Sequence, residues 1–325
     1  MTTTAEQASP WLKGRSFASW QEQFDRSGYL IFERVLASDR VAELRAALAP
    51  HLARDLFGRN DFEGTRTNRV YALLAKSPVF AELATHPLAM AFVEAELGES
   101  CLLSAMLAIN LHPGETVQPW HFDDSGAKIP RPRPALGIST FWAIDDTTEQ
   151  NGATEIIPAS HLWDGQYIEG AVQPAHFTNR AEHKEGDRPD AVKLVMPSGS
   201  LAITKGTLWH RGGANRSDRP RLIITPQYCV GWVRQLENMA LAVPAEVASQ
   251  LPERARELIG IRSIRRSWDM SMESIREGCC GRTNLTQARR RGLDARPTPR
   301  RSRTLLKSAH PHRTRCLHTP SAQRR

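Results

Sequence analysis

Residues 136–144 carry the pattern that decides the fold class, Leu136-Gly-Ile-Ser-Thr-Phe-Trp-Ala-Ile144. Apolar or β-branched side chains stand at every second position of this run: Leu136, Ile138, Thr140, Trp142 and Ile144. Successive side chains of a β-strand point to opposite faces, so a period of two places this set on one face. The run therefore predicts a half-buried strand.

Further short apolar runs of the same kind lie on both sides of this strand. They are Leu102–Leu111, Glu155–Ile157, Val192–Met196, Leu201–Thr204 and Leu222–Tyr228. Clusters of Gly, Pro and Asp separate them, and no helical pattern intervenes. A parallel sheet needs long crossovers between its strands, so this spacing predicts an antiparallel sandwich or barrel with its core at residues 101–235.

The preceding part, residues 17–100, is expected to be helical with one short strand. Gly28 follows a helical stretch and precedes a buried strand candidate at residues 29–32. Ser38 is expected to cap a second helix, because Ser favours helix starts. A third helix is expected from near Pro78 to Gly98, since Gly favours helix ends.

The chain returns to a helical pattern at residues 236–260, which we expect to cover the sheet. Val247, Leu251 and Leu258 are expected to pack inward from this segment. The domain is thus expected to span residues 17–260, preceded by a flexible N-terminus at residues 1–16.

Composition is that of an ordinary globular protein. The chain has 325 residues, of which 40% are hydrophobic and 24% are charged. No run approaches the roughly 18 apolar residues that a membrane-spanning helix needs. The start of the chain has no basic or apolar leader, and an odd number of cysteines, 5, indicates no disulfide framework. We expect a cytoplasmic protein with no membrane partner, either a monomer or a homodimer.

Positive charge is concentrated at the C-terminal end. Residues 261–325 hold 17 of the 43 Lys and Arg and 4 of the 35 Asp and Glu, a net charge of +13, whereas residues 1–260 carry −5. This segment has no hydrophobic period, which predicts a disordered basic tail. Arg-rich, Lys-poor sequence without a pattern is also typical of a GC-rich gene translated out of frame, so a frameshift near residue 262 is a second hypothesis.

The candidate catalytic centre is a His-x-Asp pair, His121 and Asp123, followed much later along the chain by His210. Residues two apart in a strand or tight turn point the same way, so the pair can offer an imidazole nitrogen and a carboxylate oxygen to one ion. Two histidines and one carboxylate suit Fe(II) and leave coordination sites for a bidentate cosubstrate and for oxygen. The alternative is a surface histidine beside an Asp123-Asp124 turn.

Arg221 follows His210 at the start of an apolar strand candidate. Its guanidinium can donate two parallel hydrogen bonds to the distal carboxylate of 2-oxoglutarate. A surface salt bridge is the alternative role. His112, in a His-Pro-Gly turn, and His161 are expected to be structural.

Several blocks in this order resemble the phytanoyl-CoA dioxygenase family of Fe(II)/2-oxoglutarate oxygenases. The resemblance extends over about residues 17 to 260. Its blocks are Phe24-Asp-Arg-Ser-Gly28-Tyr29-Leu30, Gln118-Pro-Trp-His121-Phe-Asp123, Phe141-Trp142-Ala-Ile-Asp145-Asp146, Asn151-Gly152-Ala-Thr-Glu-Ile-Ile-Pro158-Ala-Ser160-His161, His210 to Arg221, and Tyr228-Cys-Val-Gly-Trp232.

The resemblance implies a mainly β fold with flanking helices, a double-stranded β-helix or cupin-like jelly roll. It implies that His121, Asp123 and His210 bind iron and that Arg221 binds the cosubstrate. It also implies that Trp142 lines the pocket, with core packing as the alternative.

The chain departs from the family pattern near the distal histidine. Some members have Ser two residues after it, where this chain has Gly212. Asn110 and Gln118, polar residues leading into the metal loop, are candidates for additional cosubstrate contacts. The alternative is that both face water at strand ends.

The implied function is a dioxygenase that hydroxylates an unactivated C–H bond of a small organic or lipid-like substrate. It would use Fe(II), 2-oxoglutarate and dioxygen and release succinate and CO2. The loop at residues 164–190 is expected to be a lid that holds substrate-specific residues. The alternative is a catalytically impaired cupin-like binding protein whose basic tail contacts nucleic acid. We favour the enzyme and expect no nucleic-acid partner.

Overall fold

The computed structural model describes residues 4–53, 56–166, 168–178 and 188–261. The basic tail predicted from residue 261, apart from Ile261 itself, lies outside the described residues, and so does the hypothesised frameshift near residue 262. No helix among the described residues is long and apolar enough to cross a membrane.

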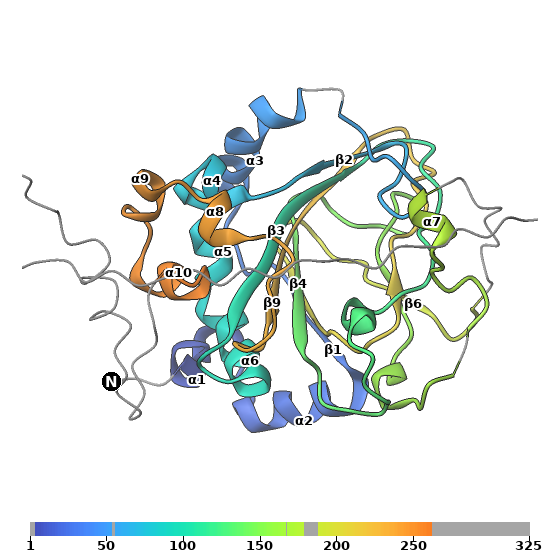
Figure 1. The fold of residues 1–325 in the computed structure, drawn as a ribbon, viewed down its shortest axis with the longest axis horizontal. Helices are drawn as coiled ribbons and strands as arrows, with labels where there is room; N and C mark the ends of the chain where they lie inside the picture. The colour runs from blue at the N-terminus through green and yellow to red at the C-terminus, as the bar shows by residue number, and fades with distance from the viewer. Residues whose placement is uncertain (1–3, 54–55, 167, 179–187, 262–325) are drawn as a thin grey trace, which may run out of the picture. The chain divides into compact units, whose positions relative to one another are not determined.

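A six-stranded sheet forms the centre of the fold (Figure 1). Each neighbouring pair of its strands is antiparallel. The strands, in spatial order, are β1 (Tyr29–Phe32), β7 (Leu201–Lys205), β4 (Gly137–Ala143), β9 (Arg221–Cys229), β3 (Leu102–Leu111) and β2 (Thr67–Val70). The predicted antiparallel architecture is confirmed, and the long central strands agree closely with the predicted ranges.

A smaller antiparallel sheet lies against one face of the large sheet. It consists of β6 (Val192–Lys193), β5 (Glu155–Ile156) and β8 (His210–Arg211). Apolar side chains from both sheets form a shared core, among them Phe141, Ile156 and Ile223. Two antiparallel sheets packed on a common core make the jelly roll that the sequence implied.

Helices cover the opposite face of the large sheet (Figure 1). The α-helices are α1 (Thr4–Gln7), α2 (Phe17–Ser27), α3 (Ser38–Leu52), α4 (Leu73–Lys76), α5 (Ala81–Thr85), α6 (Pro87–Leu97), α7 (Ala175–Thr178), α8 (Met239–Ala242), α9 (Ala245–Ala248) and α10 (Glu253–Leu258). Short 3-10 helices span Ser9–Trp11, Pro78–Phe80, Asp123–Gly126 and Ser160–Leu162. Among the α-helices, α7 is the exception and lies on the side of the small sheet (Figure 1).

Strand β4 is buried on both faces, not on one as its alternating pattern predicted. Ile138 and Trp142 pack into the core shared with the helices, and Phe141 and Ala143 pack into the core between the sheets. The strand is covered twice because the helices shield the face that would otherwise be in water.

Several helical predictions need correction. The N-terminal segment expected to be flexible contains two short helices, Thr4–Gln7 and Ser9–Trp11, and Ala8 and Leu12, which flank the second helix, are buried. The helix predicted from Pro78 to Gly98 breaks before Pro87, and the segment at 244–259 breaks before Pro252. Helical geometry is sterically disfavoured for the residue that precedes a proline, which is consistent with both breaks, although α3 continues through Pro50. Helix α3 is present, but Ala37 and not Ser38 occupies its N-cap position.

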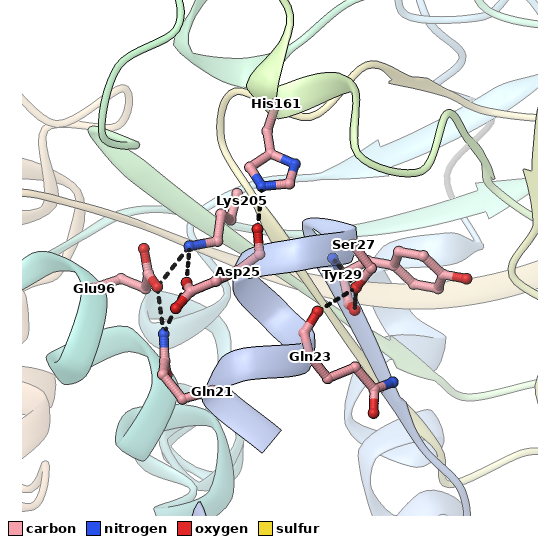
Figure 2. Close-up of polar contacts among 8 residues, drawn as sticks. All are labelled: Gln21, Gln23, Asp25, Ser27, Tyr29, Glu96, His161 and Lys205. Atoms are coloured by element: carbon pink, nitrogen blue, oxygen red, sulfur yellow. Dashed lines mark hydrogen bonds and ion pairs between the residues drawn. The ribbon is translucent and has the colours of Figure 1, made fainter. Parts of the chain in front are cut away.

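The junction between α2 and β1 brings a polar cluster onto the end of β7 (Figure 2). Gly28 ends α2 in the left-handed conformation, with φ of 79°. A Cβ atom there would lie 2.5 Å from Nδ1 of His161. The Nε2 of His161 donates to the backbone carbonyl of Asp25 at 2.8 Å, which confirms the predicted structural role of this histidine.

Lys205 at the end of β7 is the cation of this cluster (Figure 2). Its ammonium lies 2.8 Å from Asp25 Oδ1 and 2.7 Å from Glu96 Oε1. Gln21 donates to the same two carboxylates. Burial raises the pKa of Asp25, but the hydrogen bond and the charge of Lys205, together with hydrogen bonds to Gln21 and Glu96, outweigh burial and lower the pKa below its usual range. Lys205 thus joins α2 and α6 to the strand that leads to His210.

Replacing Lys205 with Ala should lower the free energy of unfolding by about 2 kcal/mol at pH 7, because it leaves the nearly buried Glu96 carboxylate without its cation. Urea unfolding followed by circular dichroism measures this change. The loss should shrink as the pH falls below about 4, because Asp25, the second carboxylate bound to Lys205, has a lowered pKa in the folded protein and stabilises the fold only while it is ionised. Arg26→Ala, which breaks an exposed ion pair with Glu22, is the control and should have little effect. A deficit that does not change with pH would contradict this account.

Candidate active site

His121 and His210 are brought together by the backbone. The amide of His121 donates to the carbonyl of His210 at 2.9 Å, and the amide of His210 donates to the carbonyl of His121 at 2.8 Å. This reciprocal pair is an antiparallel bridge between β8 and the loop that carries His121 and Asp123, which we call the metal loop. It places the two imidazole ring centroids 4.3 Å apart. Residues distant in sequence therefore share one site because they share one ladder position.

Each imidazole presents Nε2 to the site. Nδ1 of His121 donates to the carbonyl of Pro119 at 2.9 Å, and Nδ1 of His210 donates to the carbonyl of Leu208 at 3.1 Å. A proton held on Nδ1 leaves the Nε2 lone pair free for a metal. Burial lowers the pKa of His121, and the neighbouring His210 lowers it further, so His121 is neutral at physiological pH.

Asp123 supplies the third candidate ligand. Its Oδ1 lies 3.6 Å from Nε2 of His210, and its Oδ2 accepts a hydrogen bond from the Ser139 hydroxyl on β4. The ligand atoms of His121, Asp123 and His210 all lie within 4.8 Å of one another. Two imidazoles and one carboxylate on one side of a cavity fit a ferrous ion with open positions.

Arg221 is buried at the start of β9, with 2% of its surface exposed. Its Nη2 donates to the carbonyl of Gly152, whereas Nε and Nη1 have no hydrogen-bond partner among the described residues. Burial lowers the pKa of Arg221 to about 10, so it keeps its charge at neutral pH. A buried cation with free donors needs an anion. The distal carboxylate of 2-oxoglutarate fits this need, and a surface salt bridge is excluded.

A cavity of about 360 Å³ contains the three ligands and Arg221. Strand β9 lines it with Arg221, Ile223, Thr225 and Gln227, and strand β2 and the residue that follows it line it with Thr67, Arg69 and Tyr71. Both sets alternate with period two, so each is one face of its strand. Neither Arg69 nor Thr225 was predicted from the sequence. For Thr225 the available signal was the period of two that starts at Arg221. For Arg69 there was no such signal, because β2 carries no apolar period.

Two predicted cosubstrate residues lie elsewhere. Trp142 packs in the helix-side core, edge to face with His86 at 5.1 Å between ring centroids, so the prediction that it lines the pocket is wrong. Its neighbour Phe141 lines the cavity instead, because adjacent strand residues face opposite ways. Asn110 is likewise outside the cavity lining. It donates to Asn68 and contacts His112, and it is buried and not in water.

Gln118 does line the cavity, and it occupies the space around Gly212. Its Oε1 accepts from the amide of Gly212 at 2.9 Å, and its Nε2 donates to the carbonyl of Phe62 at 2.6 Å. A Cβ atom at residue 212 would lie 2.9 Å from that Oε1. The glycine that replaces the family's serine thus makes room for the Gln118 amide.

Asp124, beside the ligand Asp123, holds the metal loop in place. Its Oδ2 accepts from the amide of Leu136 at 2.6 Å and lies 3.1 Å from Nη1 of Arg133. Its amide donates to the carbonyl of Gly206 at 2.9 Å. Both side chains of the Asp124–Arg133 pair are only 7% exposed. The Asp124 side chain therefore ties the metal loop to the residue before β4, and the Asp124 amide ties it to the segment that leads to His210.

Arg131 makes a second tie from the same Arg-Pro-Arg-Pro segment. Its Nη2 donates to the carbonyls of Ser160 and Thr207 at 2.7 Å each. Its guanidinium stacks over the ring of Phe122 at 4.5 Å. Arginines at alternate positions therefore brace both ligand-bearing segments, a role that the sequence analysis did not assign.

The fold and the site together define an Fe(II)- and 2-oxoglutarate-dependent dioxygenase. A family model described as phytanoyl-CoA dioxygenase (PhyH) matches residues 24–223. The chain belongs to this family, as the sequence blocks indicated.

Curated relatives of this chain are named dioxygenases. The chain is 25% identical over 260 residues to Dioxygenase trt7 of Aspergillus terreus, which covers 75% of this chain and 83% of that protein. It is 26% identical over 283 residues to Dioxygenase FUM3 of Gibberella moniliformis, covering 80% and 85%.

Solved structures share the fold. HygX of Streptomyces hygroscopicus, with nickel and 2-oxoglutarate bound, matches with a TM-score of 0.54 and 17% identity over 68% of this chain and 90% of that one. The α-ketoglutarate-dependent carbocyclase SnoK matches with a TM-score of 0.51 and 20% identity over 67% and 85%.

Asp123→Ala should weaken metal binding by more than about 100-fold, because it removes a ligand outright, which costs at least as much as losing an outer hydrogen-bond partner. Titration of the metal-free protein with Co(II), followed by its visible absorption, measures the affinity. His112→Ala is the matched control, since this histidine lies near the cavity but contacts Asn68 and Asn110. Equal affinities of Asp123→Ala and the unchanged chain would refute the assignment.

Asp124→Asn and Arg133→Met should each weaken Co(II) binding by about 10-fold, and the double variant should lose little more, because both break one brace. Arg254→Met removes a distant ion pair of 2.8 Å with Glu94, and it controls for general destabilisation. It should lower the melting temperature while leaving Co(II) affinity unchanged. If Asp124→Asn, Arg133→Met and the double variant all bind Co(II) as tightly as the unchanged chain, the Asp124–Arg133 pair does not position the ligands.

Proposed function

We propose that this enzyme hydroxylates an unactivated C–H bond of a small organic or lipid-like substrate. One oxygen atom of O2 would enter the product hydroxyl, and the other would enter succinate, formed from 2-oxoglutarate with release of CO2. The observation that carries the proposal is the pairing of a three-ligand face with a buried, unsatisfied Arg221 in one cavity.

The chain's own residues would hold and orient the reactants. His121, Asp123 and His210 would hold the ferrous ion, which when bound would activate dioxygen with electrons from 2-oxoglutarate. Arg221 would orient the cosubstrate through its distal carboxylate, aided by Gln118 at the cavity wall. Holding both reactants in one geometry removes most of the entropic cost of the encounter.

Apolar walls suit a substrate whose reacting carbon carries no polar activation. Leu107, Ile109, Phe141 and Ile223 line the cavity from the large sheet. Phe177, from a described part of the predicted lid at 164–190, also lines it and contacts Phe62, with 4.9 Å between ring centroids. Such walls exclude water from the reacting carbon, which protects a reactive oxidant from side reactions.

Some solved structures with a similar fold are described as enzymes that catalyse reactions other than hydroxylation. SnoK is described as a carbocyclase, and SnoN, at 22% identity and a TM-score of 0.51, as an epimerase. Product mass distinguishes the outcomes, because hydroxylation adds one oxygen atom whereas cyclisation by dehydrogenation and epimerisation do not. A product without added oxygen would replace hydroxylation with one of these reactions.

The chain should convert 2-oxoglutarate to succinate in the presence of Fe(II) and ascorbate, and Asp123→Ala should not. Arg221→Ala should raise the KM for 2-oxoglutarate by about 100-fold, because a buried carboxylate loses its charge partner. Arg221→Lys should lie between, since lysine supplies charge without the fork. Co(II) affinity measured without 2-oxoglutarate should be unchanged in both Arg221 variants. Equal turnover by the unchanged chain and Asp123→Ala would end the proposal.

A further inference from the structure

The cavity extends well past the space that 2-oxoglutarate needs. Arg221 and Gln227 line it from the same face of β9, and at about 3.4 Å per residue they lie roughly 20 Å apart along the strand. Gln227 pairs with Ser139 of β4, whose hydroxyl donates to the ligand Asp123. The Gln227 end therefore lies next to the metal face, at the opposite end of β9 from Arg221.

Polar groups without partners line this second end. Thr225 is 1% exposed, and its hydroxyl lies in the cavity wall with no hydrogen-bond partner among the described residues. Two residues further along β9, the Gln227 side chain makes no hydrogen bond within the part of the chain that the structure describes. A buried hydroxyl without a partner costs free energy unless a ligand or water satisfies it.

Glu237 contributes a carboxylate to the same end. Its Oε2 accepts from the amide of Ala72 at 3.0 Å, and its Oε1 accepts from the amide of Met106 at 3.3 Å. No Lys or Arg of the described chain forms an ion pair with it. Burial raises the pKa of Glu237 to about 7 despite both hydrogen bonds, as expected for a carboxylate that lacks a cation.

The hydrogen bond from Met106 places Glu237 beside β3, at the level of the stretch of β9 that carries Thr225 and Gln227. Met106, which donates to Glu237, pairs with Pro226, the residue between Thr225 and Gln227. Ala105 pairs with Gln227, lines the cavity, and leaves its floor open because its side chain is a single methyl group. Tyr71 and Leu236 line the cavity around this floor and are partly exposed.

We propose that Thr225, Gln227 and Glu237 form a substrate subsite that binds the ammonium group of an amine whose remaining body is apolar. All three side chains can accept hydrogen bonds, and Glu237 supplies the negative charge that an ammonium needs once it leaves water. The apolar walls receive the body of the substrate. The subsite rests on the proposed function, because it assigns the substrate end of the same cavity.

The test compares probes of one shape and different polar groups: cyclohexylmethylamine, cyclohexylmethanol and cyclohexanecarboxylate. Calorimetric titration is carried out on the metal-free protein and on the protein loaded with Co(II) and 2-oxoglutarate. The amine should bind at least about 10-fold more tightly than the alcohol in both forms, and the carboxylate more weakly than either. Equal binding of amine and alcohol, or tighter binding of the carboxylate, would overturn the proposal.

Variants assign the binding to the three residues. Glu237→Gln should weaken the amine by about 10-fold or more and leave the alcohol within about twofold, because the amide keeps an acceptor but loses the charge. Glu63→Gln is the matched control, since its carboxylate also lines the cavity but pairs with Arg59. It should leave amine binding unchanged. Unchanged amine binding in Glu237→Gln would refute the assignment.

Thr225→Val and Gln227→Leu keep the proposal falsifiable if Glu237→Gln fails to fold, as judged by thermal unfolding. Each should weaken the amine about threefold to 10-fold through loss of an acceptor. No effect from either would overturn the proposal. Failure of the proposed function shows separately, because then the unchanged chain would not turn over 2-oxoglutarate, while amine binding to the metal-free protein would still report on the subsite.

Discussion

The active site depends on one reciprocal pair of backbone hydrogen bonds, between His121 and His210. Buried backbone groups must be paired, so this bridge, which attaches His121 to β8, stabilises the fold whether or not a metal is bound. It fixes the separation of the two imidazoles, and the carbonyls of Pro119 and Leu208 then fix which nitrogen of each ring faces inward. Asp123 needs only a short turn beyond His121 to complete the set.

Uncompensated charge marks the rest of the cavity. Arg221 and Glu237 are opposite charges near opposite ends of the cavity, and neither forms an ion pair with another described residue. Charges that are buried for structural reasons are normally paired, as in the Asp124–Arg133 and Lys205–Glu96 contacts of this fold. The contrast separates residues that hold the fold from residues that await a ligand, and it gives the cavity a direction from cosubstrate to substrate.

Local rules predicted much of the fold. Strands β3, β4 and β9 follow from their apolar runs, and the end of α2 follows from Gly28. The same rules missed β2 and β8, because Thr67-Asn-Arg-Val70 and His210-Arg211 are mostly polar and contain no apolar run. The family resemblance placed Trp142 in the pocket, and alternation of polarity could not correct this, since it does not show which way a residue faces on a strand buried on both sides.

The sequence by itself determined the ligand types, the antiparallel class and the family, because short motifs and strand periods are local properties of the chain. Only the tertiary structure decided that Arg221 is buried with free donors, that Asn110 turns away from the cavity, and that Thr225, Gln227 and Glu237 all line it. The physical reason is that burial and pairing depend on strand register, and register is set by contacts between segments that are distant along the chain.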